Sequence, residues 1–391
     1  MNSKLNAPIA PWPYFEEDEK QAALDVLNSG KVNYWTGTVC RKFEKEFAKY
    51  AGRKYGIALA NGSLALELAL IAYDIGPGDE VIVTCRSFVA SASCVNIRGA
   101  IPVFADVDLD SQDILPKSIE IKITSKTKAI ICVHLAGWPC DMDKINAIAK
   151  KHNLKVIEDC AQAHGAKYRG KPVGSLGNVA AFSFCQDKIM TCGGEGGIFL
   201  CDDEEIYKRC WSYTEHGKNI SILDNPNNPV VIDSFGTNWR MTEMQAAIGL
   251  CQLKKLNDWV EIRRANAFKL TSALKDIKSI RIPEPDLKFY HSYYKYYIMV
   301  KPEKLKESWN RNRIIKEISE RGINCTSGAW GELYLEEAYR KFFDGLTIER
   351  MPNAMILKAT TLMFQVHPTL TEQNIKDTIA IIREILLEAS L

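Results

Sequence analysis

An aspartate and a lysine, Asp159 and Lys188, each follow a short apolar run, and their types suit the chemistry of amines. Asp159 ends the otherwise apolar stretch 156–159, where an ionised carboxylate requires a strong partner. A protonated pyridine nitrogen would be such a partner, and a structural salt bridge would serve equally well. Lys188 precedes the glycine-rich segment 193–197, which can bring backbone close to a ligand. Lysine amines become nucleophilic where burial or nearby positive charge lowers their pKa, although most lysines are solvated surface groups.

A third feature is the pair Gly62-Ser63, which follows the apolar run 55–60 and opens a helical pattern. The free backbone N–H groups at the start of a helix, together with the helix dipole, favour a phosphate at such a place. Taken alone, the pair is better explained as a plain N-cap. The three features together are the parts that pyridoxal phosphate needs: a lysine to form a Schiff base, an acid to keep the ring nitrogen protonated, and a phosphate site.

These residues fall within an alternation of short apolar runs and helical patterns. The runs lie at residues 80–84, 101–107, 129–135, 155–160, 180–184 and 197–201, and a helical pattern such as 142–152 separates neighbouring runs. Short buried strands separated by helices predict an α/β fold with a mostly parallel sheet covered on both faces. Ligands bind at the carboxyl ends of such strands, which is where Asp159 lies.

The domain organisation is predicted from a change of character after residue 250. We expect a large α/β domain at residues 1–250, and a linking helix with a smaller α+β domain at residues 251–391. The second part contains a tyrosine-rich strand at 293–300, a helix at 306–321 and a final helix at 372–388.

Composition excludes several classes of protein. Among 391 residues, Lys plus Arg number 50 and Asp plus Glu number 48, so a formal net charge of +2 predicts neither a nucleic-acid nor a membrane partner. No apolar run approaches the roughly 18 residues that a membrane span requires. The N-terminal segment lacks the apolar core of a secretory signal, and the 12 cysteines form no C-x-x-C pair. We therefore expect a cytoplasmic protein with reduced thiols and no metal.

Several ordered motifs resemble the nucleotide-sugar aminotransferases of the DegT/StrS type, which are fold-type I pyridoxal-phosphate enzymes. The resemblance covers nearly the whole chain. It is carried by residues 43–47 (FEKEF), 61–65 (NGSLA), 87–91 (SFVAS), 102–108 (PVFADVD), 158–165 (EDCAQAHG), 183–184 with Lys188, 194–197 (GEGG), 238–241 (NWRM) and 366–368 (VHP).

The resemblance implies a role for each matching residue. Lys188 would form the Schiff base and shuttle protons, and Asp159 would pair with the pyridine nitrogen. Gln162 would lie near the phenolic oxygen of the cofactor, and Phe88 would stack on its ring. The implied phosphate ligands are Gly62, Ser63 and Ser183, joined by Asn238 from the partner subunit of a homodimer. A lysine rather than a histidine at position 188 favours transamination over dehydration.

The activity implied is transfer of an amino group from L-glutamate or L-glutamine to a nucleotide-linked keto-sugar. The product would be an amino sugar for surface polysaccharide or secondary-metabolite biosynthesis. One alternative is an aminotransferase for a cyclitol or a small keto-phosphate, and another is a cofactor-binding regulatory protein without turnover. A nicotinamide oxidoreductase is disfavoured because no G-x-G-x-x-G follows the first strand.

Two further groups have two readings each. Arg240 could bind a substrate carboxylate or sugar phosphate, or it could form a structural ion pair. The tyrosines between residues 290 and 297 alternate as in a strand, so one half of them should be buried and some of the others could line a sugar pocket.

Overall fold

The computed structural model describes residues 4–223, 229–344 and 349–391. Its centre is a seven-stranded sheet with the order β1-β9-β8-β5-β4-β2-β3. Strand β9 is antiparallel to both of its neighbours, whereas β8, β5, β4, β2 and β3 are mutually parallel. The strands are β1 (Tyr55–Leu59), β2 (Glu80–Thr84), β3 (Ile101–Ala105), β4 (Thr127–Val133), β5 (Lys155–Asp159), β8 (Val179–Ser183) and β9 (Gly197–Cys201). The predicted α/β class with a mostly parallel sheet is thus confirmed.

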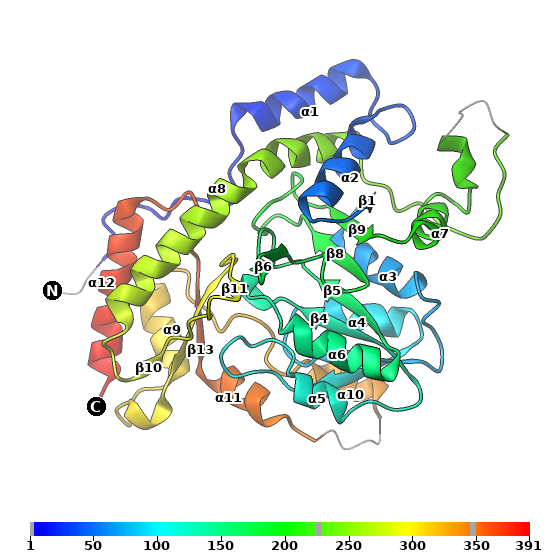
Figure 1. The fold of residues 1–391 in the computed structure, drawn as a ribbon. Helices are drawn as coiled ribbons and strands as arrows, with labels where there is room; N and C mark the ends of the chain where they lie inside the picture. The colour runs from blue at the N-terminus through cyan, green and yellow to red at the C-terminus, as the bar shows by residue number, and fades with distance from the viewer. Residues whose placement is uncertain (1–3, 224–228, 345–348) are drawn as a thin grey trace.

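Helices cover both faces of the sheet because its strands are apolar on both sides (Figure 1). All five residues of β8 and of β9 are buried. One face packs against α3 (Gly62–Ile71), α4 (Ala90–Ile97) and α7 (Glu204–Thr214). The other face packs against α2 (Val39–Tyr50), α5 (Pro116–Glu120), α6 (Met142–His152) and the first half of α8 (Glu243–Leu274).

Helix α8 connects the sheet to the C-terminal part of the chain (Figure 1). A capping box at Thr242 and Gln245 starts it, and its 32 residues run past the predicted boundary at residue 250. The division into 1–250 and 251–391 therefore stays a prediction. The second half of α8 packs on a separate apolar cluster, which also includes residues of the sheet β10-β12-β13. The elements there are β10 (Ile280–Arg281), β12 (Tyr296–Val300), β13 (Thr361–Phe364), α9 (Arg311–Glu320) and α12 (Glu372–Ala389).

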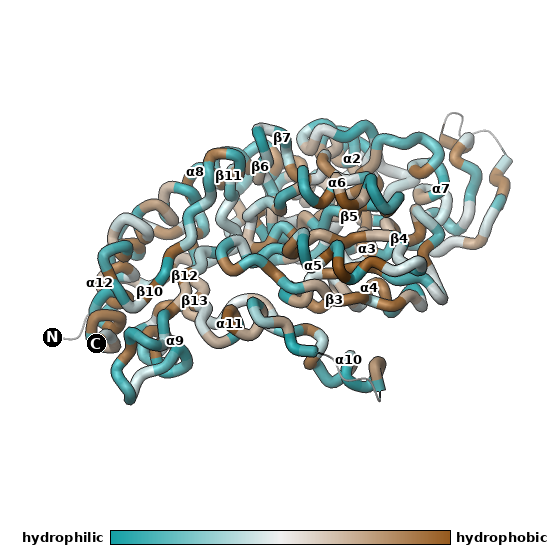
Figure 2. The backbone as a smooth tube through the Cα atoms, turned by 60° about the horizontal axis from the view of Figure 1, so that its bottom comes forward, coloured by the Kyte–Doolittle hydropathy of each residue, from teal (hydrophilic) through white to brown (hydrophobic). Residues whose placement is uncertain are grey.

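The remaining elements are short or lie at the periphery. They are α1 (Glu17–Ser29), which packs on α8, the small sheet of β11 (Phe289–Tyr290), β6 (Lys167–Tyr168) and β7 (Lys171–Pro172), and the helices α10 (Glu337–Phe342) and α11 (Pro352–Thr360). Figure 2 shows hydrophobic residues gathered in the interior around β4, β5 and α3. Among the described residues, none of the helices combines the length and the apolar character needed to cross a bilayer.

Two elements start later than the sequence indicates. The helix expected from residue 306 begins at Arg311, because the Asn310 side chain accepts a hydrogen bond from the Arg313 N–H and caps the helix there. The strand expected from residue 293 begins at Tyr296, since Tyr293 has a φ of 47°, which an extended strand does not allow.

Candidate active site

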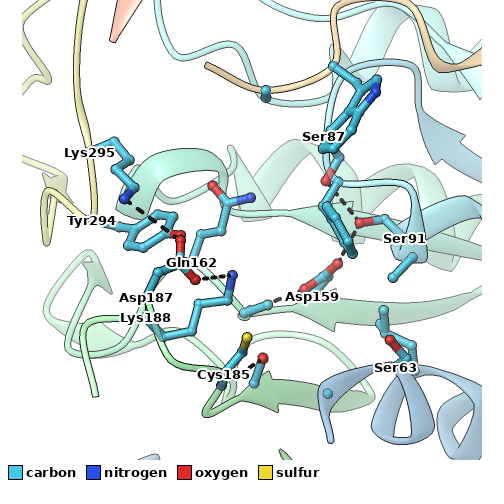
Figure 3. A pocket seen from close by; sticks show the side chains of 18 of the residues that line it. Ser63, Ser87, Ser91, Asp159, Gln162, Cys185, Asp187, Lys188, Tyr294 and Lys295 are labelled. Atoms are coloured by element: carbon cyan, nitrogen blue, oxygen red, sulfur yellow. Dashed lines mark hydrogen bonds and ion pairs between the residues drawn. The ribbon is translucent and has the colours of Figure 1, made fainter. Parts of the chain in front are cut away.

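A cavity of about 770 Å³ opens at the carboxyl ends of β5 and β8, between the sheet and segments from the C-terminal part of the chain (Figure 3). Seven of the eight predicted site residues line it. They are Gly62, Ser63, Phe88, Asp159, Gln162, Ser183 and Lys188. The C-terminal part contributes Tyr294, Lys295, Tyr297, the stretch 328–330 and Met363 to the opposite wall. The topology therefore brings together residues that lie more than a hundred positions apart.

Asp159, the last residue of β5, lies at the bottom of this cavity and is 3% exposed. Its Oδ2 accepts a hydrogen bond from the Ser91 hydroxyl at 2.7 Å, and its Oδ1 accepts one from the Ala161 N–H at 3.1 Å. Burial raises the pKa of Asp159, although the two hydrogen bonds and the charge of Lys188 oppose the rise. A buried carboxylate in this position would be stabilised by a cationic group in the cavity.

Lys188 lies in the turn that follows β8, and its side chain is 16% exposed. The Trp12 indole N–H donates a hydrogen bond to the Lys188 carbonyl at 2.9 Å, which fixes the backbone of this turn. The Lys188 Nζ lies 3.4 Å from Oδ1 of Asp187 and 5.1 Å from the centre of the Tyr294 ring. The amine is thus held inside the cavity and within reach of a ligand there.

The start of α3 and the end of β8 form a polar cradle. A Cβ on Gly62 would lie 2.5 Å from Cβ of Ser183, so only glycine lets the helix start approach the strand this closely. The Asn61 side chain caps the Leu64 N–H at 3.1 Å, and other first-turn N–H groups of α3 remain available to an anion. Ser63 and Ser183 place hydroxyl groups beside them.

Gln162 and Phe88 occupy other parts of the wall. The Gln162 Oε1 accepts a hydrogen bond from the Ala136 N–H at 2.9 Å, which leaves its amide nitrogen as a donor. Phe88 is 50% exposed, and its ring meets that of Trp330 edge to face with centroids 5.5 Å apart. An exposed aromatic pair at the cavity suits a flat or ring-shaped ligand.

Asn238 is the one predicted site residue outside the cavity lining. It lies exposed, and its Oδ1 accepts a hydrogen bond from the Arg240 N–H at 3.3 Å. Its predicted reach into the site of a partner subunit stays a prediction. Arg240 itself forms an ion pair with Glu215 at 2.7 Å, so the structural reading of this arginine holds within the chain.

The structure adds residues that sequence reasoning did not assign to the site. They are Trp12, Ser91, Asp187 and Lys295, which come from four separate segments. Tyr296 is buried in the C-terminal core, while Tyr294 and Tyr297 line the cavity. Tyr294 is buried as well and precedes the strand, so the expected alternation does not decide which tyrosines line the cavity. No spacing signal marks Ser91, since only the fold brings helix α4 against the end of β5.

The donor set fits a phosphorylated pyridine aldehyde. A cradle of helix N–H groups and hydroxyls suits the phosphate, a buried carboxylate suits a protonated ring nitrogen, and a lysine amine suits the aldehyde carbon. The close approach of Gly62 to Ser183, which a Cβ would block, is what places the helix N–H groups and the hydroxyls together in this cradle.

Comparisons with known proteins agree with this chemistry. A family model described as the DegT/DnrJ/EryC1/StrS aminotransferase family matches residues 13–383. The X-ray structure of the aminotransferase from Psychrobacter cryohalolentis is 50% identical with a TM-score of 0.94, covering 98% of this chain and 100% of that chain. GDP-perosamine synthase of Escherichia coli O157:H7 is 37% identical over 80% of this chain and 83% of its own length. The PLP-form of Spr1654 from Streptococcus pneumoniae is 26% identical with a TM-score of 0.88, covering 98% and 99% of the two chains.

Proposed function

This chain belongs to the DegT/DnrJ/EryC1/StrS aminotransferase family, and on that premise we propose that it moves an amino group from L-glutamate or L-glutamine to a nucleotide-linked keto-sugar. It is an aminotransferase, and its cofactor is pyridoxal phosphate. The observation that carries the proposal is the convergence of Asp159, Lys188 and the Gly62–Ser183 cradle on one cavity.

The residues that would hold the cofactor follow from the cavity. Ser63, Ser183 and the N–H groups of α3 would bind its phosphate, and Asn238 of a second copy would complete that site in a homodimer. Gln162 would donate to the phenolic oxygen, and Phe88 would cover one face of the ring. When bound, the cofactor supplies an electron sink for the carbanion formed at the α-carbon of the donor.

The proton steps belong to the protein. Asp159 would hold a proton on the ring nitrogen, and the hydrogen bond that Ser91 donates to its Oδ2 favours the ionised form of this carboxylate. The Lys188 amine would act as a general base that takes the α-proton of the donor, and then as a general acid that returns a proton later in the transfer. The hydrogen bond from Trp12 holds the Lys188 backbone, so the side chain moves about a fixed base.

The substrate class rests on the relatives and on the size of the cavity. The relative from Escherichia coli O157:H7 is named for a GDP-linked amino sugar, and this chain covers most of its length. A cavity of about 770 Å³ has room for a sugar beside a cofactor. We assign the product to surface polysaccharide or secondary-metabolite biosynthesis, and the reaction to the cytoplasm, where free thiols like the 12 found here persist.

The test is a half-reaction followed by a search for the acceptor. The purified holoenzyme is mixed with L-glutamate or L-glutamine, and the visible absorption of the bound cofactor is recorded. Loss of the original band and release of the 2-oxo acid are expected. Keto-sugar nucleotides are then added, and the sugar that restores the band identifies the acceptor class.

Two results would redirect the proposal. If only a cyclitol ketone or a small keto-phosphate restores the band, the acceptor class assigned here is wrong. If neither amino acid changes the spectrum while the cofactor stays bound, the chain binds the cofactor without this transfer, as a regulatory protein would.

A further inference from the structure

A second lysine, Lys295, lies in the cavity and has no role in the chemistry described above. Its side chain is 15% exposed, and its Nζ lies 3.7 Å from Oδ2 of Asp187 and 4.5 Å from the centre of the Tyr294 ring. Figure 3 shows Lys295 and Ser63 on opposite sides of the cavity, with Lys188 and Asp159 between them. Lys295 therefore lies away from the cradle that suits a phosphate.

The Asp187 carboxylate is already satisfied by other groups. Its Oδ1 faces the Lys188 amine at 3.4 Å, and the Tyr294 hydroxyl donates to its Oδ2. These contacts, together with the charge of Lys295, outweigh burial and lower the pKa of Asp187. Asp187 therefore has two partners, Lys188 and Tyr294, besides the Lys295 ammonium group.

Positive charge exceeds negative charge on this wall. Arg263 is fully buried behind it and also feels the charge of Asp187. The Nε and Nη2 of Arg263 have no hydrogen-bond partner among the residues that the structure describes. Two cations, Lys188 and Lys295, thus lie beside Asp187, and the charge of Arg263 adds to theirs. Burial lowers the pKa of Lys295 to about 8, with Arg263 and Lys188 adding to the effect and Asp187 opposing it.

We propose that Lys295 binds a carboxylate of the substrate, and this rests on the function proposed above. An added anion would balance the charge on this wall, and Lys295 is the cation there that lines the cavity without being needed for the cofactor. The carboxylate can come from either of two substrates that occupy the same cavity. It belongs either to the α-carbon of the amino-acid donor or to an acidic keto-sugar of the uronate class.

The test compares holoenzyme variants that differ in one charge. Lys295→Met removes the ammonium group, Lys295→Arg keeps the charge, and Lys301→Met removes a lysine just past β12 that lies outside the cavity lining. The donor arm measures the L-glutamate concentration that gives half of the maximal rate of the absorbance change. The acceptor arm measures binding of UDP-glucuronate against UDP-glucose, and of GDP-mannuronate against GDP-mannose, by calorimetry.

Lys295→Met is expected to weaken binding about 10-fold or more in one of the two arms, because it removes a hydrogen bond to a charged group in a buried site. If Lys295 binds the carboxylate of the donor, Lys295→Met raises the half-saturating L-glutamate concentration. If it binds the carboxylate of the sugar, Lys295→Met abolishes the preference for the acidic nucleotide sugar. Lys295→Arg should recover most of the loss, and Lys301→Met should match the wild type. Unchanged glutamate saturation together with no acidic preference overturns the proposal, as does a lower maximal rate with unchanged saturation.

A measurement on the wild type covers the case in which Lys295→Met does not fold. Acetylation of Lys295 by acetic anhydride is followed by peptide mass spectrometry, with L-glutamate or UDP-glucuronate present or absent. Protection of Lys295, but not of Lys301, is expected, and equal labelling with and without both ligands contradicts the proposal. If the wild type reacts with neither L-glutamate nor L-glutamine, the proposed function fails, which the Lys295 variants cannot mimic.

Discussion

Replacing Ser91 with alanine tests the electrostatic design of the site. The Ser91 hydroxyl donates to Oδ2 of Asp159 at 2.7 Å in a buried setting, and it is one of the groups that hold the Asp159 pKa down against burial. A hydrogen bond to a charged group contributes about 1.5–3 kcal/mol. At 1.36 kcal/mol for each pKa unit, its loss raises the pKa of Asp159 by about 1–2 units.

The assay measures the affinity of the cofactor-free protein for the cofactor between about pH 5 and pH 9, with tryptophan fluorescence as the readout. Raising the pKa of Asp159 leaves less of it ionised in mild acid, so binding to a protonated ring nitrogen weakens there first. We expect the acid side of the affinity curve to move upward by about 1 pH unit or more. Ser93→Ala on the same helix α4 is the matched control and should reproduce the wild-type curve.

Ionisations of the free cofactor affect all three proteins equally, so the difference between the curves reports Asp159. Superimposed curves for Ser91→Ala and the wild type would refute the reasoning. An equal loss of affinity at every pH would also refute it, because that pattern indicates a steric defect rather than a shifted pKa.

Three further substitutions probe the same framework. Asp159→Asn should raise the free energy of unfolding of the cofactor-free protein by about 1 kcal/mol at neutral pH, because burial raises the pKa of Asp159. Chemical denaturation should show this gain disappear as the pH falls toward 3.8, the ordinary pKa of an aspartate. The affinity for the cofactor should fall about 100-fold or more. Trp12→Phe removes the donor to the Lys188 carbonyl, so we expect unfolding to become easier by about 1 kcal/mol and the rate with L-glutamate to fall about threefold in stopped flow. Glu158→Gln disrupts a buried carboxylate that accepts three backbone N–H groups, and it should cost about 3 kcal/mol by urea denaturation. Although burial opposes it, the His134 contact helps to lower the Glu158 pKa below 4.5, so this cost should shrink as the pH falls below that value.

The parts of the site that the sequence predicted share one physical property. Asp159 ends a strand, and Gly62 and Ser63 open a helix after a strand, so local patterning and the rule of strand ends pointed to them as candidates. Ser183 also ends a strand, but only the family resemblance assigned it to the phosphate. The direction of β9 could not be predicted in this way, since an apolar run reads the same for a parallel and an antiparallel strand.

Lys295 shows why part of the opposite wall was not predicted. The tyrosine-rich run alternates from residue 293, but the strand begins only at Tyr296, after a left-handed residue at 293. Lys295 thus lies in the turn before the strand, where a period of two assigns no face. Its neighbours Asp187 and Lys188 come from a distant loop, so its charge environment exists only in the folded chain.

The role of Lys188 is tested most directly by locating the bond between the cofactor and the protein. The holoenzyme is reduced with borohydride before and after treatment with L-glutamate, and its peptides are mapped by mass spectrometry. The reduced cofactor is expected on Lys188 in the untreated enzyme, and it should be lost from that position after L-glutamate. Attachment to Lys295 or to another lysine, or attachment to Lys188 that L-glutamate and L-glutamine both leave unchanged, would contradict this role of Lys188.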